Sequence, residues 1–154
     1  MKLPQPIPDR LKDKTALITG AAGNIGFETA RRFLAEGAKV SLVDIQETAL
    51  ADTTKKLQDA FPEDPALLDR VWTIRADVTD QSDVERFVSQ TVDRFGALDT
   101  AFFCAGISYS STSILETDDE LWDNVIKVNT RSGEKSLIDL QGRILMRENS
   151  LLGH

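Results

Sequence analysis

The stretch TGAAGNIG, at Thr19–Gly26, decides how this chain folds. It follows a strand-like apolar run at 15–19 and precedes an amphipathic run at 25–36, so a strand, a glycine-rich turn and a helix are predicted in that order. A helix that starts at such a turn points its unpaired N–H groups, and the positive end of its dipole, at the crevice beyond the strand. This arrangement predicts a site for a pyrophosphate.

The three glycines of the turn each meet a separate steric demand. Gly20 permits the tight turn itself, because glycine adopts backbone angles that other residues avoid. Gly23 keeps a Cβ atom out of the path of an approaching ligand, and Gly26 allows the helix to lie close to the strand. Glycines mark many loops, so the prediction depends on the strand before the turn and the helix after it.

A carboxylate follows the second predicted strand. The run Ala38–Val43 is short and largely apolar, as expected of a buried parallel strand, and Asp44 closes it. The spacing from Gly26 suits a carboxylate that accepts hydrogen bonds from an adenosine ribose, and its charge disfavours a 2′-phosphate. Residues 45–47 contain no Lys or Arg, so we predict a preference for NAD over NADP. The alternative is that Asp44 caps a helix that starts near Glu47.

Strands and helices alternate along the rest of the chain, which predicts an α/β fold with a doubly wound parallel sheet. A helix opened by the capping box at 117–120 should bury Leu121, Trp122, Val125 and Ile126 along one side. The remaining predicted elements are a helix at 47–60, a strand at 71–76, a helix that Gly96 ends and a strand at 98–103.

Length, composition and charge favour one compact domain in the cytoplasm. The chain has 154 residues, 41% of them hydrophobic, and a net charge of −7, which argues against nucleic acid or an anionic membrane as the main partner. No apolar run approaches the roughly 20 residues of a membrane span. Cys104 is the only cysteine, so an intramolecular disulfide is impossible, and no metal site is predicted.

Five short sequence motifs occur in order along residues 10 to about 131. Because of these motifs, the chain closely resembles the short-chain dehydrogenase/reductase family. They are TGAAGNIG at 19–26, Asp44, Asp77-Val78, Cys104-Ala105-Gly106 and Val128-Asn129. The resemblance implies a Rossmann fold with strand order 3-2-1-4, here ending after about four strands. It also implies hydride transfer between a nicotinamide cofactor and an alcohol or carbonyl substrate.

The resemblance further implies roles for single residues. Asp77 and Val78 are expected to contact the adenine, Ala105 and Gly106 to border the nicotinamide ribose, and Asn129 to hold a water in a proton relay. The full set of expected cofactor-binding residues is Gly20, Gly23, Asn24, Ile25, Gly26, Asp44, Ile45, Asp77, Val78, Cys104, Ala105, Gly106 and Val128.

Two positions depart from the family pattern. Asn24 stands where glycine is more common, and it tolerates unusual backbone angles well. Cys104 replaces the asparagine of an Asn-Ala-Gly motif, so hydrogen bonds that hold the neighbouring loops are lost. A small buried apolar side chain is the favoured interpretation of this cysteine, because nothing near it in sequence would activate a thiol.

The family's Tyr-x-x-x-Lys motif is absent from the chain. Tyr109 is the only tyrosine, Ser113 stands four residues after it, and it follows the fourth strand, so we interpret it as a partly exposed loop residue. Two functions therefore stay open. One is the NAD-binding part of an oxidoreductase, which needs a catalytic part supplied elsewhere to use a small-molecule substrate. The other is a catalytically silent NAD-binding module, or an unstable product of a mis-spliced or frameshifted gene.

The chain divides into an extended lead-in at 1–9, a dinucleotide-binding domain at 10–130 and an atypical tail at 131–154. Gly133 and Gly142 interrupt the tail, whose apolar residues suit at most a short helix; a change of reading frame or a docking segment would each explain it. In the order 3-2-1-4 the fourth strand lies at an edge. Because residues 101–105 carry no proline or charge, we expect self-association through that edge.

Overall fold

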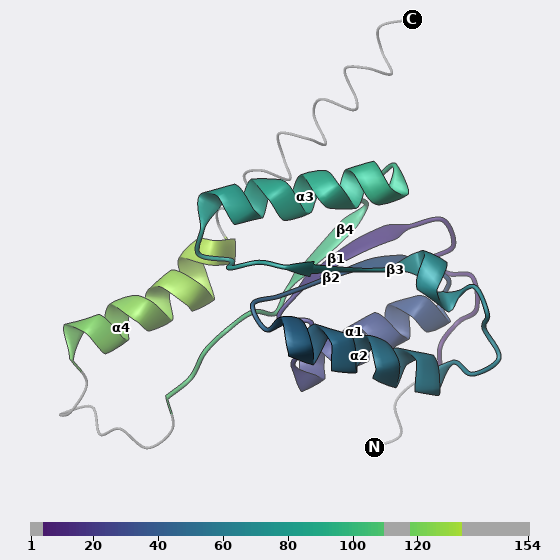
Figure 1. The fold of residues 1–154 in the computed structure, drawn as a ribbon, viewed down its shortest axis with the longest axis horizontal. Helices are drawn as coiled ribbons and strands as arrows, with labels where there is room; N and C mark the ends of the chain where they lie inside the picture. Colours follow the sequence, from purple (N-terminus) through teal and green to yellow (C-terminus); the bar gives the residue numbers. More distant parts are fainter. Residues whose placement is uncertain (1–4, 110–117, 134–154) are drawn as a thin grey trace, which may run out of the picture.

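The computed structural model describes residues 5–109 and 118–133 and shows an α/β fold with a parallel four-stranded sheet (Figure 1). The strand order β3-β2-β1-β4 confirms the predicted order. The strands are β1 (Thr15–Thr19), β2 (Lys39–Asp44), β3 (Val71–Arg75) and β4 (Thr100–Phe103). The helical elements are α1 (Asn24–Ala35), α2 (Glu47–Ala60), η1 (Leu67–Arg70), α3 (Gln81–Phe95), α4 (Asp119–Ile126) and η3 (Lys127–Arg131).

Helices cover both faces of the sheet, with α1 and α2 on one face and α3 on the other (Figure 1). Strand β1 lies between β2 and β4, and all five of its residues are buried. Side chains alternate along it: Ile18 packs into the core beneath α1 and α2, whereas Leu17 packs beneath α3. The α3 core is centred on Phe87, which is fully buried.

Helix α3 begins and ends with the local signals that its sequence carries. The carboxylate of Asp80 accepts hydrogen bonds from the backbone N–H groups of Ser82 and Asp83, which satisfies two donors of the first turn. At the other end Gly96 has φ 81°, in the left-handed region, and ends the helix as predicted.

The hydroxyl of Ser41 in β2 is buried without a hydrogen-bond partner.

A fully buried carboxylate ties the segment before β1 to the end of α1. Glu36 accepts hydrogen bonds of 2.6 Å from Nε of Arg10 and from Nε of Arg32, and its own carbonyl accepts the N–H of Leu11. Burial alone would raise the pKa of Glu36, yet the hydrogen bonds from Arg32 and Arg10 hold this pKa below its ordinary value. Residues 8–13 form consecutive turns, so the lead-in that was expected to be extended over residues 1–9 already turns at residue 8.

Helix α4 differs from its prediction in two respects. Its N-cap is Asp118, whose carboxylate accepts the N–H of Leu121 at 2.7 Å, whereas the predicted capping residue 117 lies outside the described residues. None of its described side chains is buried, and Trp122 is 58% exposed. The predicted buried side is therefore wrong, because α4 projects from the body and its contacts are mainly with η3, the continuation of the same helix (Figure 1).

Every helix within residues 5–109 and 118–133 is too short or too polar to cross a lipid bilayer. Of the tail expected at 131–154, residues 131–133 continue the helix of η3, and residues 134–154 lie outside the described residues.

Candidate nucleotide-binding site

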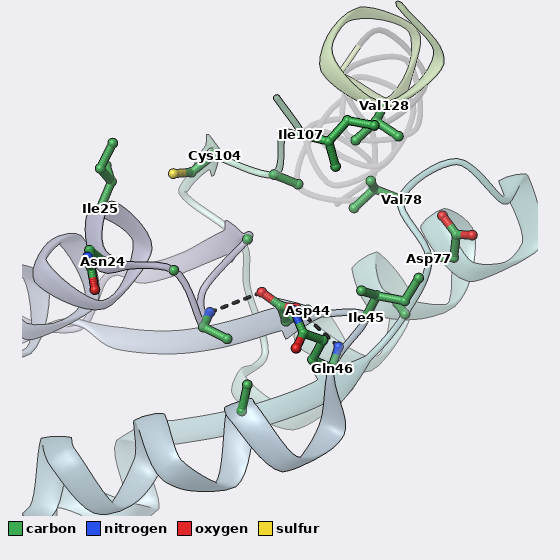
Figure 2. A pocket seen from close by; sticks show the side chains of 17 residues that line it. Asn24, Ile25, Asp44, Ile45, Gln46, Asp77, Val78, Cys104, Ile107 and Val128 are labelled. Atoms are coloured by element: carbon green, nitrogen blue, oxygen red, sulfur yellow. Dashed lines mark hydrogen bonds between the residues drawn. The ribbon is translucent and has the colours of Figure 1, made fainter. Parts of the chain in front are cut away.

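A pocket of about 730 Å³ opens at the carboxyl ends of the strands, where the glycine-rich turn, β2, β3 and the segment after β4 meet (Figure 2). A pocket of this size is typical of small-molecule and cofactor sites. It is lined by Gly20, Ala22, Gly23, Asn24, Ile25, Asp44, Ile45, Gln46, Ala49, Ala76, Asp77, Val78, Cys104, Ala105, Gly106, Ile107 and Val128. The structure thus brings together the predicted cofactor-binding residues, apart from Gly26.

Gly20 and Gly26 shape the turn from beneath the pocket. Gly20 has φ 65°, and a Cβ atom there would lie 2.7 Å from the backbone nitrogen of Ala105, so only glycine suits both the angle and the close approach. A Cβ atom on Gly26 would lie 2.3 Å from the carbonyl oxygen of Gly20. Gly26 does not line the pocket; its lack of a side chain lets α1 press against the turn.

The amino end of α1 faces the pocket, and the backbone of Gly26 in its first turn hydrogen-bonds the Cys104 thiol. Its N-cap is Gly23, which makes no side-chain capping bond, and the first turn of α1 contains no acidic residue. Helix N–H groups in this setting bind anions, and the helix dipole adds to the attraction. The turn therefore offers N–H donors suited to a pyrophosphate, and the site predicted from the sequence stays a prediction.

Asp44, at the end of β2, joins two walls of the pocket. One carboxylate oxygen accepts the N–H of Ala22 in the glycine-rich turn at 3.1 Å, and the other accepts the N–H of Gln46 at 3.1 Å (Figure 2). The N-cap of α2 is Gln46, so the alternative that Asp44 caps this helix is wrong. Each carboxylate oxygen accepts more than one hydrogen bond, so the fixed carboxylate retains acceptor capacity toward the pocket.

Asp77 and Val78 form the wall that follows β3. One oxygen of the Asp77 carboxylate accepts both the N–H and the hydroxyl of Thr79 at 2.8 Å, and the Asp77 N–H donates to Asp83 at 2.7 Å. This backbone bond, together with a hydrogen bond from Arg86, holds the pKa of Asp83 below its ordinary value. The loop is therefore held in place from α3, and Val78 is buried.

The segment after β4 forms the opposite wall. The hydroxyl oxygen of Thr19 accepts the backbone N–H groups of Cys104 and Ala105 at 3.2 and 3.3 Å. These bonds hold the loop that the loss of the family's asparagine was expected to loosen. Cys104 is partly exposed and lines the pocket, which corrects its interpretation as a buried apolar residue. Burial nevertheless raises the pKa of its thiol, with a smaller opposing contribution from the backbone of Gly26.

Asn129 lies on η3 and pairs with the backbone of Ile107. Its side-chain carbonyl accepts the Ile107 N–H at 2.8 Å, and its amide nitrogen donates to the Ile107 carbonyl at 2.9 Å. Asn129 itself does not line the pocket, whereas Val128 beside it does. The described contacts of the Asn129 side chain thus fix the loop after β4.

Tyr109 lies outside the pocket. Its ring is 48% exposed, and its hydroxyl accepts a hydrogen bond of 2.9 Å from the side chain of Asn124 on α4. The structure thus places the only tyrosine of the chain on the α4 side of the loop, as an exposed residue.

Sequence reasoning missed five lining residues. Four of them adjoin predicted positions in the chain, and Ala49 lies one helical turn along α2, so the strand ends themselves were a usable signal. Ile107 had no signal beyond its place after Gly106. The missed residues are Ala22, Gln46, Ala49, Ala76 and Ile107.

Comparison with known proteins identifies the family. A family model described as "short chain dehydrogenase" matches residues 14–133. The chain belongs to the short-chain dehydrogenase family. Short-chain dehydrogenase reductase 5 of Arabidopsis thaliana is 38% identical over 122 residues, which cover 79% of this chain and 44% of that protein. 3beta-hydroxysteroid dehydrogenase 2 of Eggerthella lenta is 35% identical over 122 residues, with the same two coverages.

Solved structures of short-chain dehydrogenases share the fold. The crystal structure of levodione reductase has a TM-score of 0.78 and 33% identity, covering 86% of this chain and 50% of that one. A 3-ketoacyl-(acyl-carrier-protein) reductase from Brucella melitensis complexed with NADH has a TM-score of 0.71 and 28% identity, with coverages of 84% and 50%. The chain spans about half the length of these proteins.

Proposed function

We propose that this short-chain dehydrogenase domain binds NAD(H) in preference to NADP(H). The observation that carries the proposal is the carboxylate of Asp44, which is fixed at the pocket by Ala22 and Gln46. A ribose with free 2′- and 3′-hydroxyls offers this carboxylate two donors, whereas a 2′-phosphate would meet it with like charge. None of the lining residues within the described part of the chain is Lys or Arg, so none of them offsets that repulsion.

The other parts of the dinucleotide have separate places in the pocket. The amino end of α1 receives the pyrophosphate, and Ile45 and Val78 flank the adenine beside the Asp77 carboxylate. Cys104, Ala105, Gly106 and Val128 border the nicotinamide end. A bound nicotinamide supplies hydride transfer, and we propose that the whole protein uses it on an alcohol or carbonyl group. Asn129 positions the loop that borders this end.

Titration calorimetry of the purified chain with NADH and with NADPH tests the proposal. We expect NADH to bind at least about tenfold more tightly, a difference of ~1.4 kcal/mol. The variant Asp44→Arg should reverse this order. Asp52→Arg, which makes the same charge change at an exposed site on α2, should leave the order unchanged. Equal or tighter binding of NADPH by the unaltered chain would refute the proposal.

The second candidate function is nucleotide binding without turnover, and the position of Tyr109 favours it. The only tyrosine lies outside the pocket and hydrogen-bonds to Asn124, so it is not placed to exchange a proton with a substrate. General acid–base catalysis is typically worth about 10²–10⁴ in rate. We therefore expect the 154-residue chain alone to give near-background turnover of secondary alcohols and ketones. Separately, we propose that the protein is located in the cytoplasm. Turnover that disappears in Tyr109→Phe would contradict this candidate.

A further inference from the structure

Three consecutive residues at the end of β3 are each held by a hydrogen bond with a neighbouring element. The carbonyl of Arg75 accepts a bond of 3.0 Å from the guanidinium of Arg86 on α3. The N–H of Ala76 donates to the carbonyl at the end of β2 at 3.0 Å, and the N–H of Asp77 donates to the carboxylate of Asp83 on α3 at 2.7 Å. Ala76 and Asp77 line the pocket, so these bonds determine where that wall lies.

Asp83 and Arg86 form an ion pair on α3 whose bonds reach beyond their own helix. The guanidinium of Arg86 donates both to Asp83 and to the carbonyl of Arg75. Glu28 and Arg31 form a pair of the same spacing on α1, at 2.7 Å, but its described bonds stay within that helix. An exposed pair of that kind adds little beyond its own helix, whereas the pair on α3 connects the first turn of α3 to a wall of the pocket.

The bond from Asp83 to the wall is a strong one. The N–H of Asp77 and the guanidinium of Arg86 hold the pKa of Asp83 below its ordinary value, so this carboxylate is charged at neutral pH. Hydrogen bonds to charged acceptors are shorter and stronger than those between neutral groups. Neither Asp83 nor Arg86 lines the pocket, so both act on its shape from behind the wall.

The position of this wall matters for the base of a bound dinucleotide. Adenine carries an amino group that can donate to the Asp77 carboxylate, whereas hypoxanthine carries at the same ring position a carbonyl oxygen, which a carboxylate repels. A site built to accept a donor rejects an analogue that lacks it. Because hydrogen bonds weaken steeply when they are misaligned, a wall that can retreat loses both the attraction and the repulsion.

We propose that the Asp83–Arg86 pair positions the wall of Ala76, Asp77 and Val78, and thereby sets the selectivity of the pocket for adenine over bases that carry a carbonyl oxygen in place of its amino group. Both are positioning residues, because neither meets the ligand. The inference rests on the proposed function, which places the adenine beside this wall, and adds to it two residues of α3 that lie outside the pocket.

Titration calorimetry of the full chain compares NADH with its hypoxanthine analogue, reduced nicotinamide hypoxanthine dinucleotide. The unaltered chain should bind NADH about tenfold more tightly. In Asp83→Ala and in Arg86→Ala this ratio should fall to about twofold or less, mainly through weaker binding of NADH. The preference for NADH over NADPH should persist in both variants, because it depends on the Asp44 carboxylate. The matched control Glu28→Ala, which breaks the pair confined to α1, should keep both selectivities.

Three results would overturn the inference. They are an unchanged base ratio in the folded variants, equal binding of the two dinucleotides by the unaltered chain, and a loss of both selectivities together, which would indicate a general loosening of the domain. In the first two cases, a retained preference of the unaltered chain for NADH over NADPH leaves the proposed function standing. The Arg86 side chain is 39% exposed, so Arg86→Ala decides the matter even if Asp83→Ala folds poorly. A folded unaltered chain that binds neither dinucleotide would overturn both proposals.

Discussion

Replacement of Gly26 by alanine should destabilise the domain, although alanine is the better helix former. In an unobstructed helix the change from glycine to alanine is worth about 1 kcal/mol of added stability. Here the new Cβ would lie 2.3 Å from the Gly20 oxygen and 2.7 Å from the Ala21 Cα atom, against 3.4 Å or more for ordinary contact. Both neighbours are backbone atoms, so no flexible side chain can turn aside and α1 itself must move.

The size of the loss follows from these two opposing contributions. Overpacking of a close contact typically costs about 1–3 kcal/mol, and a clash with backbone on this scale belongs at the upper end. After the helix-propensity gain, the expected net loss for Gly26→Ala is about 2 kcal/mol of unfolding free energy. For a chain of this length that loss corresponds to a fall in Tm of about 4–8 °C.

Thermal and urea unfolding followed by circular dichroism measure this effect, with Gly133→Ala as the matched control. Among the described residues nothing lies within 4 Å of a Cβ atom placed on Gly133, which lies in the helical turn after η3, so its replacement should leave Tm unchanged or higher. Gly26→Ala should also weaken NADH binding, because the amino end of the displaced α1 no longer faces the pocket in the same position. A Gly26→Ala domain as stable as the Gly133→Ala domain would refute the steric reasoning.

Three further predictions follow from the packing and charges. The pKa of Asp83 is held below its ordinary value of 3.8, so the contacts of this carboxylate stabilise the fold above pH 3.8, and their stabilisation is lost as the pH falls through the lower pKa of the folded state. A plot of Tm against pH should therefore be flatter on the acid side for Asp83→Asn than for the unaltered chain. Parallel curves would contradict this. Ser41→Ala removes a buried hydroxyl that has no partner and should raise the unfolding free energy by about 1 kcal/mol, whereas a loss in urea unfolding would show that the hydroxyl is satisfied. The chain should self-associate through the edge of β4. Phe102 lies on that strand and is 37% exposed, so Phe102→Lys should shift sedimentation toward the monomer. A monomeric unaltered chain would be evidence against the edge contact.

The sheet and most of the pocket could be predicted because they depend on local patterns. A glycine-rich turn between a strand and a helix has few stable geometries, and parallel strands bring Asp44, Asp77 and the loop after β4 to one edge whatever their separation along the chain. The carboxyl ends of the strands therefore predicted the lining residues well. Gly26 was expected to serve close packing, and its position under the turn agrees with that expectation.

What could not be predicted depends on pairs of residues far apart in sequence. The burial of Glu36 between Arg10 and Arg32 has no signature in a single helix pattern, because an acidic residue near a helix end normally lies in water. The exposure of Trp122 was missed for the opposite reason: an apolar stripe predicts which side of a helix can be buried, and burial also requires an element to pack against it.

The end of β1 links the stability of the domain to its ligand site. Thr19 holds the loop after β4 through the Cys104 and Ala105 N–H groups, Gly20 admits that loop at close range, and Gly26 brings α1 down on Gly20. These contacts join three walls of the pocket at one short junction where the neighbouring atoms are backbone. Because backbone cannot repack as side chains do, a substitution here that costs stability must also move a ligand-facing group. Unfolding free energy and nucleotide affinity should therefore fall together for variants at this junction, whereas they should separate for variants of Asp44, which acts on the ligand through its charge.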